Sequence, residues 1–140
     1  MTAIHESGHF LDSNIWIYAL ANHEYIDKRH IACGLVNGEG VIISTQVINE
    51  VCLNLIKKSS FTEPKIKQLI EAFYQGYHII TFNRDIFVNS SHLRSRYNFS
   101  FWDSLIVACA LAGGASILYS EDMHHGLLVD NKLQIVNRFK

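Results

Sequence analysis

The fold is decided by residues 100–122, SFWDSLIVACALAGGASILYSED, where one glycine pair interrupts a long apolar run. Ser100 is a capping residue and predicts a helix over residues 101–112, which Gly113 and Gly114 end. Residues 116–119 then predict a strand. From Asp103 the helix spans about 15 Å, and the returning chain covers a similar length at about 3.3 Å per residue. Asp103 and Asp122 are therefore expected at the same end of this helix–strand pair.

Outward from this stretch, strands and helices alternate along the chain. We expect strands at residues 9–12, 41–43, 78–81, 116–119 and 133–136. We expect helices at residues 15–20, 24–36, 45–56, 62–76, 83–97 and 101–112, with Thr45 as the cap of the third. Strands separated by helices of this length form βαβ units and a parallel sheet. The sequence therefore predicts an α/β fold with four to five strands, in a single domain over residues 1–140.

Composition excludes several classes of protein. Hydrophobic residues make up 49% of the 140 residues and there is one proline, which excludes a disordered or low-complexity chain. The formal net charge of −1 gives no global basic field for nucleic acid, so any such binding needs a local patch or metal ions.

Cys33, Cys52 and Cys109 lie among apolar neighbours and predict reduced thiols. Residues 1–9 lack the apolar core of a signal peptide, and glycines interrupt the uncharged stretch 104–120. We expect a cytoplasmic protein with no membrane segment.

Four acidic residues occupy equivalent places in this alternation. Asp12 ends the first strand, Glu50 lies one turn into the helix after the second, and Asp103 and Asp122 flank the helix–strand pair described above. The carboxyl edge of a parallel sheet is where such proteins bind ligands. Four carboxylates there would repel one another, whereas Mg²⁺ prefers a few carboxylates plus water and leaves positions for phosphate oxygens. The pattern predicts metal-assisted phosphodiester hydrolysis.

Each acid also has a structural interpretation. Asp12 can cap the helix that follows it, and Ser100 with Asp103 fits the Ser-x-x-Asp capping pattern. Asp122 can begin a loop, and Glu50 can simply face solvent. The four together favour function, because apolar neighbours such as Leu53 and Trp102 predict little exposed surface beside Glu50 and Asp103.

Four segments resemble the motifs of the PIN-domain family, in order and over almost the whole chain. They are FLDSNIWIYAL (10–20), STQVINEV (44–51), FWDSLIVACAL (101–111) and ILYSEDM (117–123). The chain looks like a VapC-type toxin ribonuclease of a bacterial type II toxin–antitoxin pair. The resemblance implies an α/β/α sandwich around a parallel sheet and an endoribonuclease that depends on Mg²⁺ or Mn²⁺. It also implies an RNA substrate, a homodimer and an antitoxin that occludes the site.

Carried over residue by residue, the resemblance makes Asp12, Glu50, Asp103 and Asp122 the metal-binding and catalytic acids. Ser120 stands where the family has a supporting Ser or Thr, and Ser13 and Asn14 are implied beside the metal site. Glu121 adjoins Asp122, so the choice of ligand between these two stays open.

Other residues carry weaker signals. His124 and His125 are expected in a loop at the mouth of the site, because no further His or Cys has zinc-ligand spacing. Trp16 and Trp102 are expected in the core rather than as platforms for bases. Candidate phosphate contacts, each also explicable as a solvated surface residue, are Lys57, Lys58, Lys65, Lys67, Arg84, Arg94 and Arg96.

Two other functions compete with a nuclease. A phosphoacceptor receiver domain also has acids at a sheet edge, but residues 12–14 lack its acid pair. An inactive PIN-like scaffold that binds RNA or protein is the other alternative, and the presence of all four acids argues against it.

Overall fold

The computed structural model describes residues 8–21 and 25–140. Within these ranges the strands are β1 (Gly8–Leu11), β2 (Val41–Ser44), β3 (His78–Ile80), β4 (Ala115–Tyr119), β5 (Leu128–Val129) and β6 (Leu133–Val136). The helices are α1 (Ser13–Leu20), α2 (Ile26–Val36), α3 (Thr45–Ser59), α4 (Glu63–Gly76), α5 (Arg84–Arg96) and α6 (Phe101–Ala112). The predicted α/β class is confirmed. The expected helix start at residue 24 and the signal-peptide argument on residues 1–7 lie outside the described residues.

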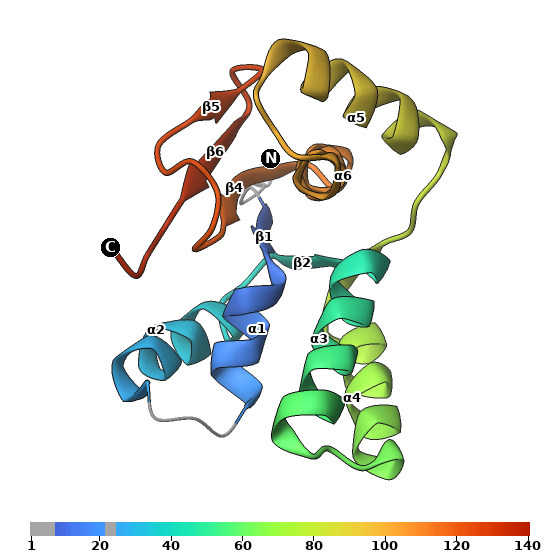
Figure 1. Ribbon diagram of the computed structural model, residues 1–140, viewed down its shortest axis with the longest axis vertical. Helices are drawn as coiled ribbons and strands as arrows, with labels where there is room; N and C mark the ends of the chain where they lie inside the picture. The colour runs from blue at the N-terminus through green and yellow to red at the C-terminus, as the bar shows by residue number, and fades with distance from the viewer. Residues whose placement is uncertain (1–7, 22–24) are drawn as a thin grey trace, which may run out of the picture.

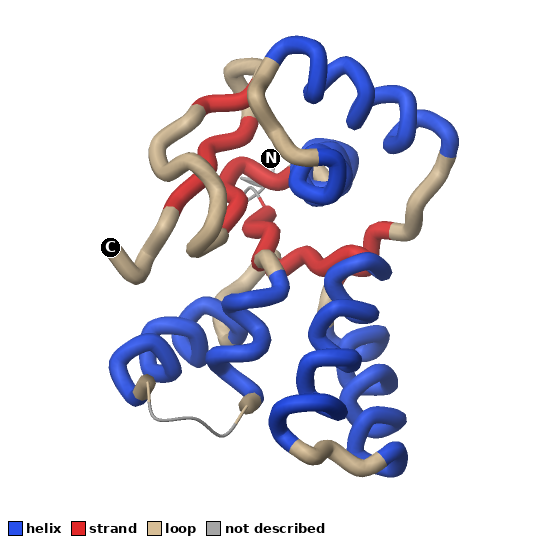
Figure 2. The backbone as a smooth tube through the Cα atoms, in the orientation of Figure 1, coloured by secondary structure: helices blue, strands red, loops and turns tan. Residues whose placement is uncertain are grey.

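The strands form one sheet in the order β3-β2-β1-β4-β6-β5, parallel except for the antiparallel pair of β5 and β6. Figure 1 shows α1 to α4 on one side of this sheet and α5 and α6 on the other. In Figure 2 the strands run as a central band between these two groups of helices. The molecule is therefore an α/β/α sandwich, as the family resemblance implies.

Burial on both faces explains the strand sequences. All four residues of β2 are buried, and the central residues of the neighbouring strands, Phe10, Leu118 and Ile135, are inaccessible to solvent. A parallel sheet covered by helices on both faces needs such continuous apolar runs. Gly113 serves this packing, because a side chain there would come within about 3.1 Å of Ile80 and crowd α6 against the sheet.

The sheet differs from the prediction in two local features. The two-residue strand β5 is missing from the sequence prediction, because it is shorter than any recognisable alternating pattern. It pairs with β6 through a tight turn that is closed by a hydrogen bond from the Lys132 amide to the Val129 carbonyl, and the two central residues, Asp130 and Asn131, have the positive φ angles of a type I′ turn. Ser44, rather than the expected Thr45, caps α3, since its Oγ accepts a hydrogen bond from the Val47 amide.

The strand order reverses between β1 and β4. The chain passes from β1 to β2 and on to β3 at one edge, and then returns across the sheet to place β4 on the other side of β1. The carboxyl ends of these two central strands are the place where open α/β sheets bind ligands. Within the described ranges, the helices are too short or too polar to cross a lipid bilayer.

Candidate active site

Asp12 lies directly after β1, at the reversal point, and is only 6% exposed. Its Oδ1 accepts a hydrogen bond of 2.7 Å from the Ser13 amide, and its Oδ2 accepts one of 2.8 Å from the Ser120 hydroxyl. Burial raises the pKa of Asp12, although both hydrogen bonds oppose this, and the charges of Asp103 and Asp122 add to the rise. Asp12 therefore caps α1 as the structural interpretation required, and also holds a second oxygen among other acids.

A network of hydrogen bonds ties the end of β4 to the start of α1. The buried Ser120 hydroxyl accepts from the Asp122 amide at 3.3 Å while it donates to Asp12. Asn14 contacts the two residues that follow Ser120. Its Nδ2 donates to Asp122 Oδ2 at 3.2 Å, and its Oδ1 accepts from the Glu121 amide at 3.4 Å. These contacts orient the Asp122 carboxylate toward the β1 side of the site.

Asp103 occupies the first turn of α6 and is half-buried. Its amide donates to the Ser100 hydroxyl at 3.1 Å, so the predicted capping pattern is confirmed. Burial raises the pKa of Asp103, a hydrogen bond with Ser100 lowers it, and the Asp122 charge raises it further. Capping and proximity to the other acids thus coexist in one residue.

Glu50 approaches from the second turn of α3. Partial burial raises its pKa to about 7, and the charges of Asp12 and Asp103 contribute to that rise, while a hydrogen bond from Gln46 lowers it. The charges of Asp12 and Asp103 act on Glu50, and the charge of Asp122 acts on Asp12 and Asp103, so these four carboxylates, from four separate segments, lie near one another at the same edge of the sheet.

Glu121 points into a different environment from its neighbour Asp122. Its carboxylate pairs with the Lys28 Nζ at 2.6 Å and accepts a hydrogen bond from the Tyr18 hydroxyl at 2.6 Å. Burial acts to raise the pKa of Glu121, but Lys28 and Tyr18 outweigh it and the pKa is lowered. The geometry therefore favours Asp122 over Glu121 as the acid that faces the site. Lys28 has no sequence motif, which is why sequence analysis missed it.

The acids do not form a preassembled metal cage. In the described part of the chain, no group of three or more His, Cys, Asp or Glu side chains is arranged to hold an ion by itself. The donor set nevertheless fits Mg²⁺, which takes one or two carboxylates and keeps several waters. Charge repulsion among these acids is the unfavourable feature that a divalent cation would relieve.

Two cavities flank the acids. One, of about 440 Å³, contains Asp103, Asp122 and His124, so His124 does lie at the mouth of the site. Arg96 also lines this cavity and pairs with Asp130 at 2.7 Å. The other, of about 430 Å³, is lined by Glu50 together with Gln46, Asn49, Phe82 and Trp102.

Trp102 is exposed, although the sequence predicted it in the core. Trp16 is buried as predicted, and its Nε1 donates to the Leu11 carbonyl. Trp102 is 64% exposed, and Leu53 is also exposed, so the expectation of little exposed surface beside Glu50 and Asp103 is wrong. The reason is that α6 buries Ser104 to Ala110, whereas Phe101 and Trp102 in its first turn are left uncovered.

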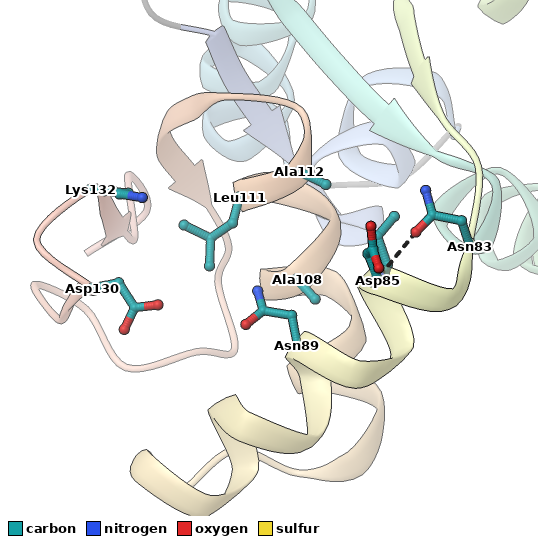
Figure 3. A pocket seen from close by; sticks show the side chains of 9 residues that line it. Asn83, Asp85, Asn89, Ala108, Leu111, Ala112, Asp130 and Lys132 are labelled. Atoms are coloured by element: carbon teal, nitrogen blue, oxygen red, sulfur yellow. Dashed lines mark hydrogen bonds between the residues drawn. The ribbon is translucent and has the colours of Figure 1, made fainter.

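A third pocket, of about 450 Å³, lies apart from the four acids. Figure 3 shows Asn89 of α5 and Leu111 of α6 around it, with Asp130 and Lys132 from the β5–β6 turn. None of the nine residues that line it is among the predicted site residues.

The fold is that of an α/β protein with a cluster of acids at the strand-order reversal. Residues 9–125 match the family model of the PIN domain. The chain belongs to the PIN domain family, which confirms the resemblance found in the sequence. Comparison with curated proteins gave no match.

Solved structures of similar fold come from several bacteria. A toxin–antitoxin complex from Klebsiella pneumoniae has a TM-score of 0.63 and 20% identity, over 82% of this chain and 87% of that chain. VapBC2 from Rickettsia felis, bound to a DNA fragment from its promoter, has a TM-score of 0.62 and 21% identity, over 92% and 97%. VapC20 from Mycobacterium tuberculosis, a sarcin–ricin loop-cleaving toxin, has a TM-score of 0.62 and 14% identity, over 79% and 87%.

Proposed function

We propose that this protein is a metal-dependent endoribonuclease that hydrolyses RNA phosphodiester bonds. The observation that carries the proposal is the buried Asp12, fixed by Ser120 at the strand-order reversal and electrostatically coupled to Glu50, Asp103 and Asp122. The charges of these four acids repel a polyanionic substrate unless cations lie between them, because Arg96, which lines the cavity of Asp103 and Asp122, is paired with Asp130. RNA recognition by this site therefore requires a divalent ion, Mg²⁺ or Mn²⁺.

The four acids would hold the ion from two sides of the site. Asp12 and Asp122, held by Ser120 and Asn14, form the fixed side of the ion site. Asp103 and Glu50 complete it from α6 and α3. The ion supplies activation of water and neutralisation of phosphate charge. In the reaction a water would lose a proton as its oxygen bonds to phosphorus, the bond from phosphorus to one ribose oxygen would break, and that oxygen would take up a proton.

The proposed biological role is that of the toxin in a toxin–antitoxin pair. This role is supported by the similarity in fold to a toxin–antitoxin complex and to VapC and VapBC proteins. We propose that a cognate antitoxin binds the protein and that the toxin forms a homodimer. Non-toxic RNA processing by the same acids is the alternative, and it predicts normal growth when the protein is abundant without a partner.

The proposal is tested with purified protein and structured RNAs, in Mg²⁺ and in EDTA, by mapping the new RNA ends. We expect cleavage only with the metal, and a loss of at least about 100-fold in Asp12→Asn, because even loss of an outer partner of a metal ligand costs 10–100-fold. Glu71→Gln, at an exposed acid on α4, is the matched control and should cut normally. Cleavage at full rate in EDTA or in Asp12→Asn would contradict the proposal.

The toxin role needs a separate test in cells. Induced expression of the chain alone should stop growth, and Asp103→Asn should restore it at equal protein level. Normal growth with abundant wild-type protein would leave the nuclease proposal standing and remove the toxin role.

A further inference from the structure

The cavity beside Glu50 has an unusual lining for the surface of a monomer. Its walls are the rings of Phe82, from the loop after β3, and Trp102, from the first turn of α6. Its remaining sides are Gln46, Asn49 and Glu50 on α3. Aromatic rings and amide groups thus surround a space of about 430 Å³ that shares a wall with the candidate nuclease site.

Trp102 is exposed although its chemistry favours burial. Its indole is 64% exposed, and it contacts Phe101 edge-to-face, with ring centroids 5.3 Å apart. Phe82 in turn contacts Phe87 at 5.3 Å, so the two walls rest on further rings rather than on flexible chains. Together with the exposed rings of Phe87 and Phe101, these two walls form a contiguous apolar patch, and such patches mark binding sites.

Gln46 supplies a second, independent observation. Its side chain is nine-tenths buried, and within the described part of the chain its Oε1 accepts no hydrogen bond. Its amide group hydrogen-bonds toward Glu50. Buried carbonyl oxygens in proteins are rarely left without a donor, so a rotation of this cavity-lining side chain that brings Oε1 to the surface would offer an acceptor to a ligand N–H.

These features select one class of occupant. The ligand has a flat π face that stacks on Trp102 and an N–H edge that reaches Gln46. Because Glu50 borders both this cavity and the acidic site, the ligand is also part of a molecule that continues to the acids. We infer that this cavity binds an unpaired nucleobase of the RNA substrate, next to the phosphate that is cut. Bases in single-stranded RNA are bound in this way, by stacking on aromatic side chains and by hydrogen bonds to their edges.

The inference rests on the proposed function, because it takes RNA as the substrate. It adds a specificity element: cleavage would require at least one nucleotide that can leave its helix. Every natural base presents an N–H donor to Gln46, so the site binds any base that is not paired. Asn49, which lines the same cavity, can add a preference among the bases.

The chain has two tryptophans, which makes a direct test possible. Trp16 is 2% exposed and serves as an internal reference, whereas Trp102 is open to a base. The probe is a short single-stranded RNA of mixed sequence, and its comparison is the same RNA with abasic riboses throughout. With Mg²⁺ present, and with fluorescence read immediately after mixing, before the RNA is cut, the intact RNA should quench wild-type tryptophan fluorescence more than the abasic RNA does. Trp102→Phe should remove the quenching.

Affinity gives the second readout. Trp102→Ala should weaken binding of the intact RNA by about 5- to 150-fold, with little effect on the abasic RNA, and Trp102→Phe should retain most of the affinity. Tyr74→Ala removes an aromatic ring of similar exposure on α4 and should bind like wild type. Gln46→Met should lose affinity for the intact RNA only, whereas a purely structural role would weaken both RNAs equally.

Each other outcome has a distinct meaning. Equal binding by wild type and Trp102→Ala, in a protein that cuts RNA, overturns the base site and leaves the nuclease proposal intact. Base-dependent quenching in a protein that never cuts RNA overturns the nuclease proposal alone. Fluorescence that changes with protein concentration without RNA, together with loss of self-association in Trp102→Ala, shows that a second copy covers the cavity and overturns the inference.

Discussion

The two sides of the acidic site differ in how their side chains are held. On the β1–β4 side, Asp12, Asn14 and Ser120 form a connected set of hydrogen bonds, and Asp12 is buried. On the α3–α6 side, Glu50 and Trp102 border an open cavity and are exposed. The first side has its geometry before any ligand arrives, whereas the second can adjust to one. A nuclease that must hold an ion rigidly and accept different RNA shapes needs both properties.

Breaking the fixed side gives the largest expected effect. Ser120→Ala removes the hydroxyl that donates to Asp12 Oδ2, so we expect Mg²⁺ affinity or cleavage to fall by about 10–100-fold. Ser120→Thr keeps the hydroxyl and should restore most of this loss. Isothermal titration with Mg²⁺ and initial cleavage rates measure the two effects.

The matched control is Ser90→Ala, at an equally buried serine that bonds Phe87 and Arg94 away from the acids. A similar loss of metal affinity in Ser90→Ala would mean that Ser120 acts only through general stability, and the two sides of the site would then not differ as described.

Mg²⁺ bound by acids from both sides of the site should stabilise the folded protein, and the size of this effect tests whether the α3–α6 side takes part in binding. Binding to the folded state alone raises the free energy of unfolding, by about 2.7 kcal/mol at a concentration of 100 times Kd. Asp103→Asn removes one of the repelling charges and keeps the cap, because the Ser100 hydroxyl bonds the backbone amide. Its metal-free melting temperature should hold or rise, and its shift with Mg²⁺ should shrink.

Thermal melts across a Mg²⁺ titration at neutral pH measure both effects, with Glu71→Gln as the control for loss of an acid elsewhere. An identical response to Mg²⁺ in wild type and Asp103→Asn would remove Asp103 from the ion site.

The pH dependence of metal-free stability is the smallest expected effect. The pKa of Glu50 is about 7 in the folded protein and 4.5 as a free side chain. Between these values the unfolded chain has lost a proton that the folded protein keeps, so the free energy of unfolding falls as the pH rises, and the loss is complete above about pH 7. The raised pKa values of Asp12 and Asp103, which face Glu50, act in the same direction.

Chemical denaturation at pH 5 and pH 8 in EDTA tests this prediction. The difference between wild type and Glu50→Gln separates the contribution of Glu50 to the pH dependence of stability from that of the histidines. The variant should lose less stability than wild type over this range. Parallel curves for the two proteins would show that Glu50 is solvated and uncoupled from the other acids.

Sequence patterns predicted the parts of the fold that depend on continuous apolar runs. The α6–β4 unit formed as expected, because its capping serine, its glycine pair and its apolar run all favour the same structure. Strand β5 was missed, although Asp130 and Asn131 are residues that tolerate the positive φ angles of its turn. Such a turn is visible in the sequence only if the flanking strands are long enough to be recognised.

The site was predicted at the level of its acids but not of their surroundings. Capping and catalytic interpretations of Asp12 and Asp103 were treated as alternatives, yet Asp12 caps α1 with one carboxylate oxygen, bonds Ser120 with the other, and is coupled by charge to Asp103 and Asp122. The choice between Glu121 and Asp122 needed Lys28, which lies 93 positions from Glu121 in the sequence. Trp102 was misplaced because hydropathy does not tell which turn of an apolar helix is left uncovered.

The position of β1 between β2 and β4 has a consequence for synthesis of the chain. Asp12 is made early, but its hydroxyl partner Ser120 and the acids Asp103 and Asp122 belong to the last third of the sequence. A ribosome-bound chain lacks half of the acidic site until the centre of the sheet is completed by β4. The nuclease that we propose would therefore have its complete set of acids only when translation of the chain is almost finished.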